Sequence, residues 1–214
     1  NKSRNLYIRD GSYLTGDEVF SYTVKRDNLV KSDKFYRVYN LKCDTDWLTL
    51  VQKKTYIRNN QTATVNVKID KSKVKEPGMY TAKITAYRDD ASKTPEFDMI
   101  ATFVIPYEIN LSNNYRMNWK DQTINQGMIK RYFVKVPAGQ NSMKITLSRD
   151  ASSNKYSRCR YFLSNNDGVQ IDGSNVLYSV NKDEKIQNYY YDLEPGIYEI
   201  DIDGFFLASD PSTY

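Results

Sequence analysis

Apolar and polar residues alternate with a period of two in short runs along the chain, and this pattern limits the fold more than any other feature. Successive side chains of a β-strand point to opposite faces, so these runs predict strands with one buried face. The runs are residues 19–24, 35–41, 63–69, 99–105, 143–147 and 197–203. No window keeps the i, i+3, i+4, i+7 spacing of a helix over three turns, and only residues 70–75 fit a single helical turn. The sequence therefore predicts an all-β chain.

A five-residue motif that occurs twice indicates two domains. Residues 76–80 (Glu-Pro-Gly-Met-Tyr) recur as residues 194–198 (Glu-Pro-Gly-Ile-Tyr). Pro-Gly favours a type II turn, in which the glycine has a positive φ. The two copies fit either a true repeat or two unrelated turns of ordinary sandwiches. With about 150 residues per domain as a guide, we predict two consecutive antiparallel β-sandwiches, residues 1–108 and 109–214, the first immunoglobulin- or fibronectin-like.

Two polar stretches lack the alternating pattern. Residues 110–114 (Asn-Leu-Ser-Asn-Asn) follow Pro106, which ends a predicted strand, and predict the connection between the two domains. Residues 150–154 (Asp-Ala-Ser-Ser-Asn) predict an exposed loop inside the second domain.

The sequence contains no histidine. Histidine is the side chain that titrates near neutral pH and the commonest metal ligand in proteins. Without it the chain by itself forms no Ser-His-Asp triad, no Cys-His dyad and no histidine-based zinc or iron site. We therefore assign no catalytic, metal or cofactor-binding residue and expect no cofactor.

Charge and cysteine content restrict the partners and the compartment. The net charge is +5, with Lys and Arg interleaved with acids, so no basic stripe of the kind that binds nucleic acid is present. No apolar run approaches the roughly 20 residues of a transmembrane helix, and we expect no membrane partner. Cys43 and Cys159 are far apart in sequence and are expected to stay unpaired, which fits a reducing compartment.

Acidic residues are the remaining candidates for chemistry. Glu199, Asp201 and Asp203 share one face of a predicted strand, where three carboxylates would suit a calcium ion or a catalytic pair. Alternation with Ile200 and Ile202 favours a plain solvent face instead. Residues 165–168 (Asn-Asn-Asp-Gly) resemble a calcium loop only loosely and favour a hairpin turn.

Aromatic residues offer a second kind of site. Tyr189, Tyr190, Tyr191, Tyr7, Tyr13, Tyr56 and Tyr87 could line a platform on which sugars or bases stack, or they could pack at strand edges and in cores. Trp47 and Trp119, one in each predicted domain, favour roles as core or inter-domain anchors. The two sequons at Asn60 and Asn110 are close to chance matches in a chain this rich in asparagine.

One segment carries more specific information about the protein's family than the amino-acid composition does. Residues 127–139 (Gly-Met-Ile-Lys-Arg-Tyr-Phe-Val-Lys-Val-Pro-Ala-Gly) resemble the G-x-I-x-R-x-F-x-x-V-P-x-G pattern of tripeptidyl peptidase II, which follows its subtilisin-type catalytic domain. Other features occur in that family's order: an R-G-I-Y-L-R-like run at residues 4–9, Asp46-Trp47-Leu48 at its Trp-containing strand, an E-G-x-H-Y-like turn at 76–80 and a G-Y-D-like segment at 86–89. The second domain also resembles the jelly-roll modules appended to secreted proteases.

The resemblance implies a non-catalytic region of a subtilisin-like serine peptidase that removes tripeptides from free N-termini. The family's catalytic Asp, His and Ser lie upstream of the matched segment, so the expected partner is an upstream catalytic domain of the same polypeptide. The family also implies a cytoplasmic homo-oligomer, with an architectural, assembly or substrate-access role for this region. Lys130, Arg131, Trp47 and Trp119 are the candidate interface or structural residues.

Two other classes of function stay open. The chain could be a secreted carbohydrate- or surface-binding pair of β-sandwiches, in which Tyr and Trp rings form the stacking platforms. A stand-alone carboxylate enzyme is the weakest alternative, because no pair of acids differs from a solvent face.

Overall fold

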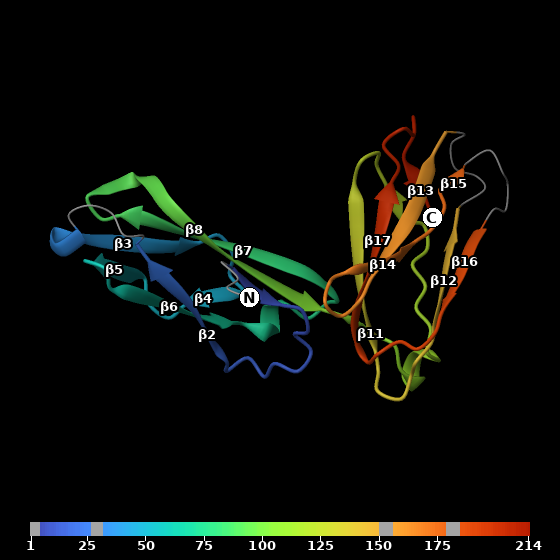
Figure 1. Cartoon of the computed structure of the whole chain (residues 1–214), viewed down its shortest axis with the longest axis horizontal. Coiled ribbons are helices and arrows are strands. Elements are labelled where there is room, and N and C mark those ends of the chain that lie inside the picture. Colours follow the sequence, from blue (N-terminus) through green and yellow to red (C-terminus); the bar gives the residue numbers. More distant parts are fainter. Residues whose placement is uncertain (1–4, 27–31, 150–155, 179–184) are drawn as a thin grey trace. The chain divides into compact units, whose positions relative to one another are not determined.

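The computed structural model describes residues 5–26, 32–149, 156–178 and 185–214. The described residues form β-strands, short 3-10 turns and loops, with no α-helix among them, which confirms the predicted all-β, sandwich-type fold (Figure 1). The chain divides into two compact units, Asn1–Ile105 and Pro106–Tyr214. The loop predicted at residues 150–154 lies outside the described residues. So does Arg4, the first residue of the R-G-I-Y-L-R-like run at residues 4–9.

The first unit has two sheets that enclose one core. A five-stranded sheet has the order β1-β8-β7-β3-β5, and a three-stranded sheet has the order β2-β6-β4. Pairing is antiparallel except between β1 and β8. The strands are β1 (Leu6–Ile8), β2 (Val19–Lys25), β3 (Tyr36–Cys43), β4 (Leu48–Leu50), β5 (Lys54–Arg58), β6 (Thr62–Ile69), β7 (Gly78–Arg88) and β8 (Ala91–Ile105).

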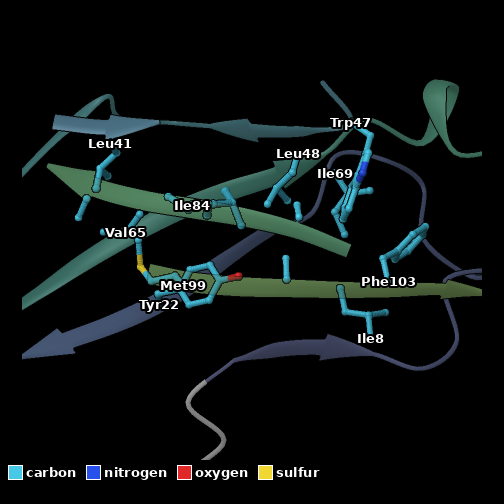
Figure 2. Packing of buried hydrophobic residues seen from close by; sticks show 14 of the residues in the cluster. Ile8, Tyr22, Leu41, Trp47, Leu48, Val65, Ile69, Ile84, Met99 and Phe103 are labelled. Carbon is cyan, nitrogen blue, oxygen red and sulfur yellow. The ribbon is translucent and has the colours of Figure 1, made fainter. Parts of the chain in front are cut away.

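The core of the first unit lies between these sheets. Val65 of β6 and Ile84 of β7 are fully buried in the same cluster, so side chains of both sheets interlock. Figure 2 shows Trp47, Leu48 and Phe103 in this cluster, with the Trp47 and Phe103 ring centroids 6.2 Å apart. Each alternating run predicted in this half contributes its apolar face to the cluster, as a one-sided sheet requires.

The second unit is also built from β-sheets that enclose a hydrophobic core, but its strands are arranged differently. Its larger sheet has the order β14-β13-β17-β11-β9, with β15 also paired to β13, and smaller sheets pair β12 with β16 and β10 with β18. Residues of β11, β12, β13 and β17 share one hydrophobic core. The strands are β9 (Tyr107–Glu108), β10 (Thr123–Ile124), β11 (Ile129–Val136), β12 (Met143–Ser148), β13 (Arg158–Ser164), β14 (Gln170–Gly173), β15 (Leu177–Tyr178), β16 (Lys185–Tyr190), β17 (Gly196–Gly204) and β18 (Ser212–Thr213).

The connection between the units differs from the predicted one. Tyr107 and Glu108 pair in parallel with β11, so they belong to the second unit rather than to the first predicted domain. The polar stretch at residues 110–114 also lies within the second unit. There Asn110 caps a 3-10 turn, Leu111–Asn113, by accepting a hydrogen bond from the Ser112 N–H. The stretch lacks alternation because it is a capped turn and not because it joins domains. The finer assignments, fibronectin-like and jelly-roll-like, stay predictions.

The two Glu-Pro-Gly-x-Tyr segments both lead into a long central strand, but neither forms the predicted type II turn. Gly78 starts β7 opposite Ile105 and lacks the positive φ that such a turn requires. Gly196 starts β17 opposite Val136 with a φ of 148°, far from the value near about +80° of a type II turn. In both copies strand pairing begins at the glycine itself, and this sets its backbone conformation.

Candidate functional site

Trp47 lies in the core of the first unit. Its side chain is 6% exposed, and its ring contacts Tyr80 and Phe103 at centroid distances of 6.3 and 6.2 Å. Trp47 precedes the short strand β4, and its carbonyl accepts a hydrogen bond from the Asp70 N–H. The indole therefore fills a gap between the two sheets and offers no surface to a ligand.

Trp119 belongs to an aromatic group at one edge of the second core. Its ring lies 5.1 Å from that of Tyr107 and 4.5 Å from that of Tyr132, which hydrogen-bonds through its hydroxyl to Tyr214 at 2.9 Å. Burial raises the pKa values of Tyr132 and Tyr214, so both phenols stay protonated at neutral pH. The indole N–H of Trp119 is buried and has no partner within the described part of the chain.

Lys130 and Arg131 are adjacent in β11 and therefore point to opposite faces of the sheet. Lys130 is opposite Ile202 in the register, and its ammonium group contacts Gln122 and lies 5.8 Å from the Tyr132 ring centroid. Arg131 is opposite Asp201 on the other face. The pattern G-x-I-x-R thus places its arginine among the acidic residues of β17.

The three acids of β17 lie on the face away from the core, as alternation predicts, but they are not simply solvated. The Nε atom of Arg131 lies 3.1 Å from a carboxylate oxygen of Glu199 and 3.6 Å from one of Asp201. Arg160 of β13 pairs with Asp203 at 2.8 Å. The three carboxylate side chains are only 15–20% exposed. The solvent-face interpretation therefore needs correction: this face is a ladder of arginine–carboxylate pairs.

Aromatic side chains complete that face. The guanidinium carbon of Arg160 lies 4.7 Å from the Phe162 ring centroid and 5.3 Å from that of Phe205. Planar guanidinium groups suit simultaneous pairing with carboxylates and stacking on rings. Sequence reasoning found the acids but missed Arg160 as a partner, because the pairing between β13 and β17 is not visible in the chain's order. The only sequence signal for this pairing was the alternation of polar positions in the two strands.

The acidic face does not meet the requirements of a metal centre. Among the residues that the structure describes, no group of three His, Cys, Asp or Glu side chains is placed to hold a metal ion. Each acid of the ladder is already in contact with an arginine, which competes with a cation for the carboxylate. The Asn165–Asn166–Asp167–Gly168 segment is a hairpin connection between β13 and β14, as predicted, with a φ of 76° at Gly168.

The buried cysteine of the second unit is not a reactive centre. Cys43 and Cys159 are both free thiols, as expected. Cys159 is fully buried, and this burial raises the pKa of its thiol to about 11. Since the thiolate is the nucleophilic form, Cys159 is chemically inert at neutral pH.

The residues of the 127–139 pattern define both ends of β11. Gly127 before the strand and Gly139 after it have φ values of 70° and 85°, in the left-handed region that favours glycine. The Gln140 N–H donates a hydrogen bond to the Pro137 carbonyl at 3.2 Å and closes the turn after the strand. The pattern therefore encodes a strand between two tight turns, with the arginine on its ion-paired face.

Comparisons with known proteins find a related sequence and several similar solved structures. The chain is 30% identical over 109 residues to pyrolysin from Pyrococcus furiosus, a match that covers 50% of this chain and 8% of pyrolysin. The crystal structure of tripeptidyl peptidase 2 matches 98% of this chain and 19% of its own, with a TM-score of 0.70 and 14% identity. The secreted serine protease VesC from Vibrio cholerae matches 98% of this chain and 48% of its own, with a TM-score of 0.47 and 9% identity. No protein-family model matches the chain.

The chain thus covers 8% of the curated relative and 19% of the tripeptidyl peptidase 2 chain that it matches. No helix in the described part of the chain has the length and apolar character needed to cross a membrane. The sequence match to pyrolysin and the fold shared with tripeptidyl peptidase 2 confirm what the motifs indicate: the chain resembles a β-sandwich region of the tripeptidyl peptidase II-like, subtilisin-like peptidases.

Proposed function

We propose that this chain is a non-catalytic, architectural region of a subtilisin-like serine peptidase whose catalytic domain lies in the same polypeptide. The observation that carries the proposal is the shared fold: nearly the whole chain superposes on a fifth of tripeptidyl peptidase 2. The absence of histidine from the sequence agrees with it, because the general base of a subtilisin-type triad has to come from elsewhere.

The described geometry suits a supporting role. Each unit has its own hydrophobic core, and the long paired strands β7, β8, β11 and β17 give the units stiff frames. The arginine–carboxylate ladder of the second unit fixes polar side chains of three strands on one face. Such a region stabilises a neighbouring catalytic domain by holding its attachment points in place, rather than by contributing a reacting group.

Two further properties belong to the same proposal. The parent protein is expected to assemble as a homo-oligomer, with this region helping assembly or shaping access of substrates to the active site. A cytoplasmic location is proposed on the basis of the two free cysteines, since disulfides form readily in oxidising compartments, and secretion is the alternative.

The test uses the full-length parent peptidase with Arg131→Ala, which removes the shared partner of Glu199 and Asp201. The control is Lys68→Ala, at an exposed position of β6. An architectural role predicts that Arg131→Ala shortens the half-life of thermal inactivation while the titrated active-site concentration stays the same. If the sedimentation coefficient of the parent peptidase also changes, the region acts in assembly of the oligomer. If the ratio of the cleavage rates for tripeptide substrates and protein substrates changes instead, the region shapes the access of substrates to the active site. No difference from Lys68→Ala in any of these measurements contradicts the proposal.

A further inference from the structure

The outer face of the five-stranded sheet in the first unit gathers tyrosines from three neighbouring strands, of which Tyr36 and Tyr56 are exposed and Tyr87 is half-buried. Strands β5, β3 and β7 lie side by side, with Val38 opposite Tyr56 and Asn40 opposite Tyr87. Tyr39 is buried in the core, so its neighbours in the alternating strand, and the residues opposite them, point outward. Tyr36, Tyr56 and Tyr87 therefore lie on one surface, called here the tyrosine face.

Two of these rings form a continuous aromatic surface. Tyr36 and Tyr56 are each 59% exposed, and their ring centroids are 6.2 Å apart with an interplanar angle of 34°. Singly exposed aromatic rings are normal on a protein surface, whereas adjacent exposed rings that form a patch mark contact surfaces. The sequence pointed to Tyr56 and Tyr87 as platform candidates, and the structure adds Tyr36 between their strands.

Basic groups border the rings. The ammonium group of Lys42 lies 5.1 Å from the Tyr87 ring centroid, and Arg58 is directly opposite Tyr36 in the register. No ion pair involving Lys42 or Arg58 occurs among the described residues. Lys54 also lies on this face, where it pairs with Asp89 at 3.2 Å.

Two of the acids near this face, Asp89 and Asp90, are already paired with basic groups. The Asp89 carboxylate accepts hydrogen bonds from Asn40 at 2.7 Å and from Lys54, and these contacts lower its pKa. Asp90 pairs with Arg88 at 2.6 Å, which lowers the pKa of that carboxyl as well. Lys42 and Arg58, which form no ion pair within the described part of the chain, add positive charge to the tyrosine face.

Two shallow hollows flank Tyr36. One has a volume of about 350 Å³ and is lined in part by Tyr36, Arg58 and Asn59. The other, of about 260 Å³, is lined in part by Tyr36, Val38 and Asp89. A ligand that lies over the Tyr36 ring therefore finds charged groups on both sides of it and the amide of Asn59 on one side.

We propose that the tyrosine face binds an acidic polysaccharide, whose sugar rings stack on Tyr36 and Tyr56 while its carboxylates pair with Arg58 and Lys42. Sugar rings present flat C–H surfaces that suit aromatic faces, and their hydroxyls suit the amide of Asn40 and the carboxylate of Asp89. The unpaired cations favour an anionic over a neutral glycan. This activity is additional to the architectural role and independent of peptidase chemistry.

The composition of this face distinguishes a glycan from other ligands. The centre of a protein–protein interface is depleted in charged residues, whereas here each tyrosine has a charged neighbour and Val38 is the aliphatic residue of the patch. Single-stranded nucleic acid requires a basic groove that follows its phosphates. The tyrosine face is instead part of a sheet surface in which Asp89 lies between the basic groups.

The binding test uses the chain with polygalacturonate, alginate and hyaluronate in affinity electrophoresis and calorimetry, with fully methyl-esterified polygalacturonate as the neutral counterpart. The variants are the double substitution Tyr36→Ala/Tyr56→Ala and the charge variant Arg58→Gln. Tyr191→Ala, an exposed tyrosine of the second unit, is the matched control. Thermal unfolding of each variant checks that the fold is kept.

Binding of at least one polyuronate, weakened about tenfold or more by the double tyrosine variant and unchanged in Tyr191→Ala, is the expected result. Arg58→Gln is expected to reduce the preference for the acidic polymer over its methyl ester. Absence of binding to all three polymers overturns the proposal, as does binding that high salt abolishes and the tyrosine variant leaves unchanged. Tighter binding of oligothymidylate through the same tyrosines also overturns it, in favour of a nucleic-acid site.

Discussion

The two units use the same five-residue segment in different packing environments. In each, Glu-Pro-Gly-x-Tyr leads into a central strand, and the tyrosine hydroxyl interacts with the backbone of the glutamate four residues earlier. The Tyr80 hydroxyl donates to the Glu76 carbonyl at 2.8 Å. At Tyr198 burial raises the pKa of the phenol, and the backbone of Glu194 acts to lower it, as an N–H donor does. This tyrosine–glutamate contact, called here the clasp, therefore occurs in both units with a different hydrogen-bonding arrangement.

The glycines of the two copies show where the likeness ends. A Cβ atom built on Gly78 has no neighbour within 4 Å, whereas one built on Gly196 lies 2.4–2.5 Å from side-chain atoms of Asn166. The Asn166 amide donates to the Pro195 carbonyl at 3.1 Å, so it is held against the turn. The shared motif therefore specifies where each strand starts. In the second unit, the hairpin between β13 and β14, which contains Asn166, also restricts which residues of the motif can be substituted.

The largest expected difference between the units concerns their tryptophans. Trp47→Ala leaves a cavity between the two sheets of the first unit and is expected to cost about 3–5 kcal/mol of unfolding free energy. Trp119 lies at the edge of the second core, so Trp119→Ala is expected to cost roughly 2 kcal/mol. Urea unfolding followed by circular dichroism measures both values.

Because each unit has one tryptophan, fluorescence of Trp47→Phe and Trp119→Phe reports on one unit at a time. In Trp47→Phe the remaining fluorescence reports the unfolding transition of the second unit, and in Trp119→Phe it reports that of the first. Equal losses for the two alanine variants would show that the cores do not differ as described.

The paired glycines give the next largest effect. Gly196→Ala combines a φ of 148° with the clash against Asn166 and is expected to destabilise the second unit by about 2 kcal/mol. Gly78→Ala, the matched control, is expected to change stability by less than about 0.5 kcal/mol or to raise it slightly. Thermal unfolding monitored through the tryptophan of each unit makes the comparison. A neutral Gly196→Ala would contradict the packing of the turn on the hairpin.

Loss of the clasp hydroxyl is a smaller change. Tyr80→Phe is expected to cost about 1 kcal/mol, because its hydroxyl loses the hydrogen bond to the Glu76 carbonyl. Tyr198→Phe is expected to cost less, because the described residues offer its hydroxyl no carbonyl acceptor of this kind. The phenylalanine ring keeps the packing, so the difference isolates the hydrogen bond. Urea midpoints with unchanged slopes measure it. An unchanged stability in both variants would show that the clasp is incidental.

The smallest expected effect is a pH dependence of the first unit. Hydrogen bonds from the backbone N–H groups of Thr15 and Gly16 lower the pKa of Glu18 from 4.5 to about 2. A lowered pKa in the folded state means that this contribution is present above pH 4.5 and is lost as the pH falls toward 2. Glu18→Gln should therefore flatten the fall in stability over that pH range, measured by the fluorescence of Trp47. An unaltered profile would contradict the role of Glu18.

Much of the fold followed from alternation alone. The predicted runs at residues 63–69 and 197–203 coincide closely with β6 and β17, because each of these strands has one buried face. β8 is far longer than its predicted run at residues 99–105, since its first half contains Pro95 and polar residues. Pro95 lies at a register shift opposite Tyr87, where the ladder is already interrupted, and a proline there costs no hydrogen bond of the regular pattern.

The candidate sites were less predictable, because they depend on which strands become neighbours. Arg131 and the acids of β17 were identified separately, and their pairing needed the register between β11 and β17. Tyr36 and Tyr56 are twenty residues apart in sequence and meet only because β3 and β5 are antiparallel neighbours. Periodicity assigns a residue to a face of its own strand, whereas strand order decides its partners.

The central claim is that this chain supports a subtilisin-like peptidase without catalysing its reaction. The most direct measurement compares the 214-residue chain with its full-length parent protein in tripeptide release from the free N-termini of peptides, with and without a serine-directed inhibitor. We predict no release by the chain alone and inhibitor-sensitive release by the parent. Release by the chain alone, or a parent without inhibitor-sensitive activity, would contradict the account.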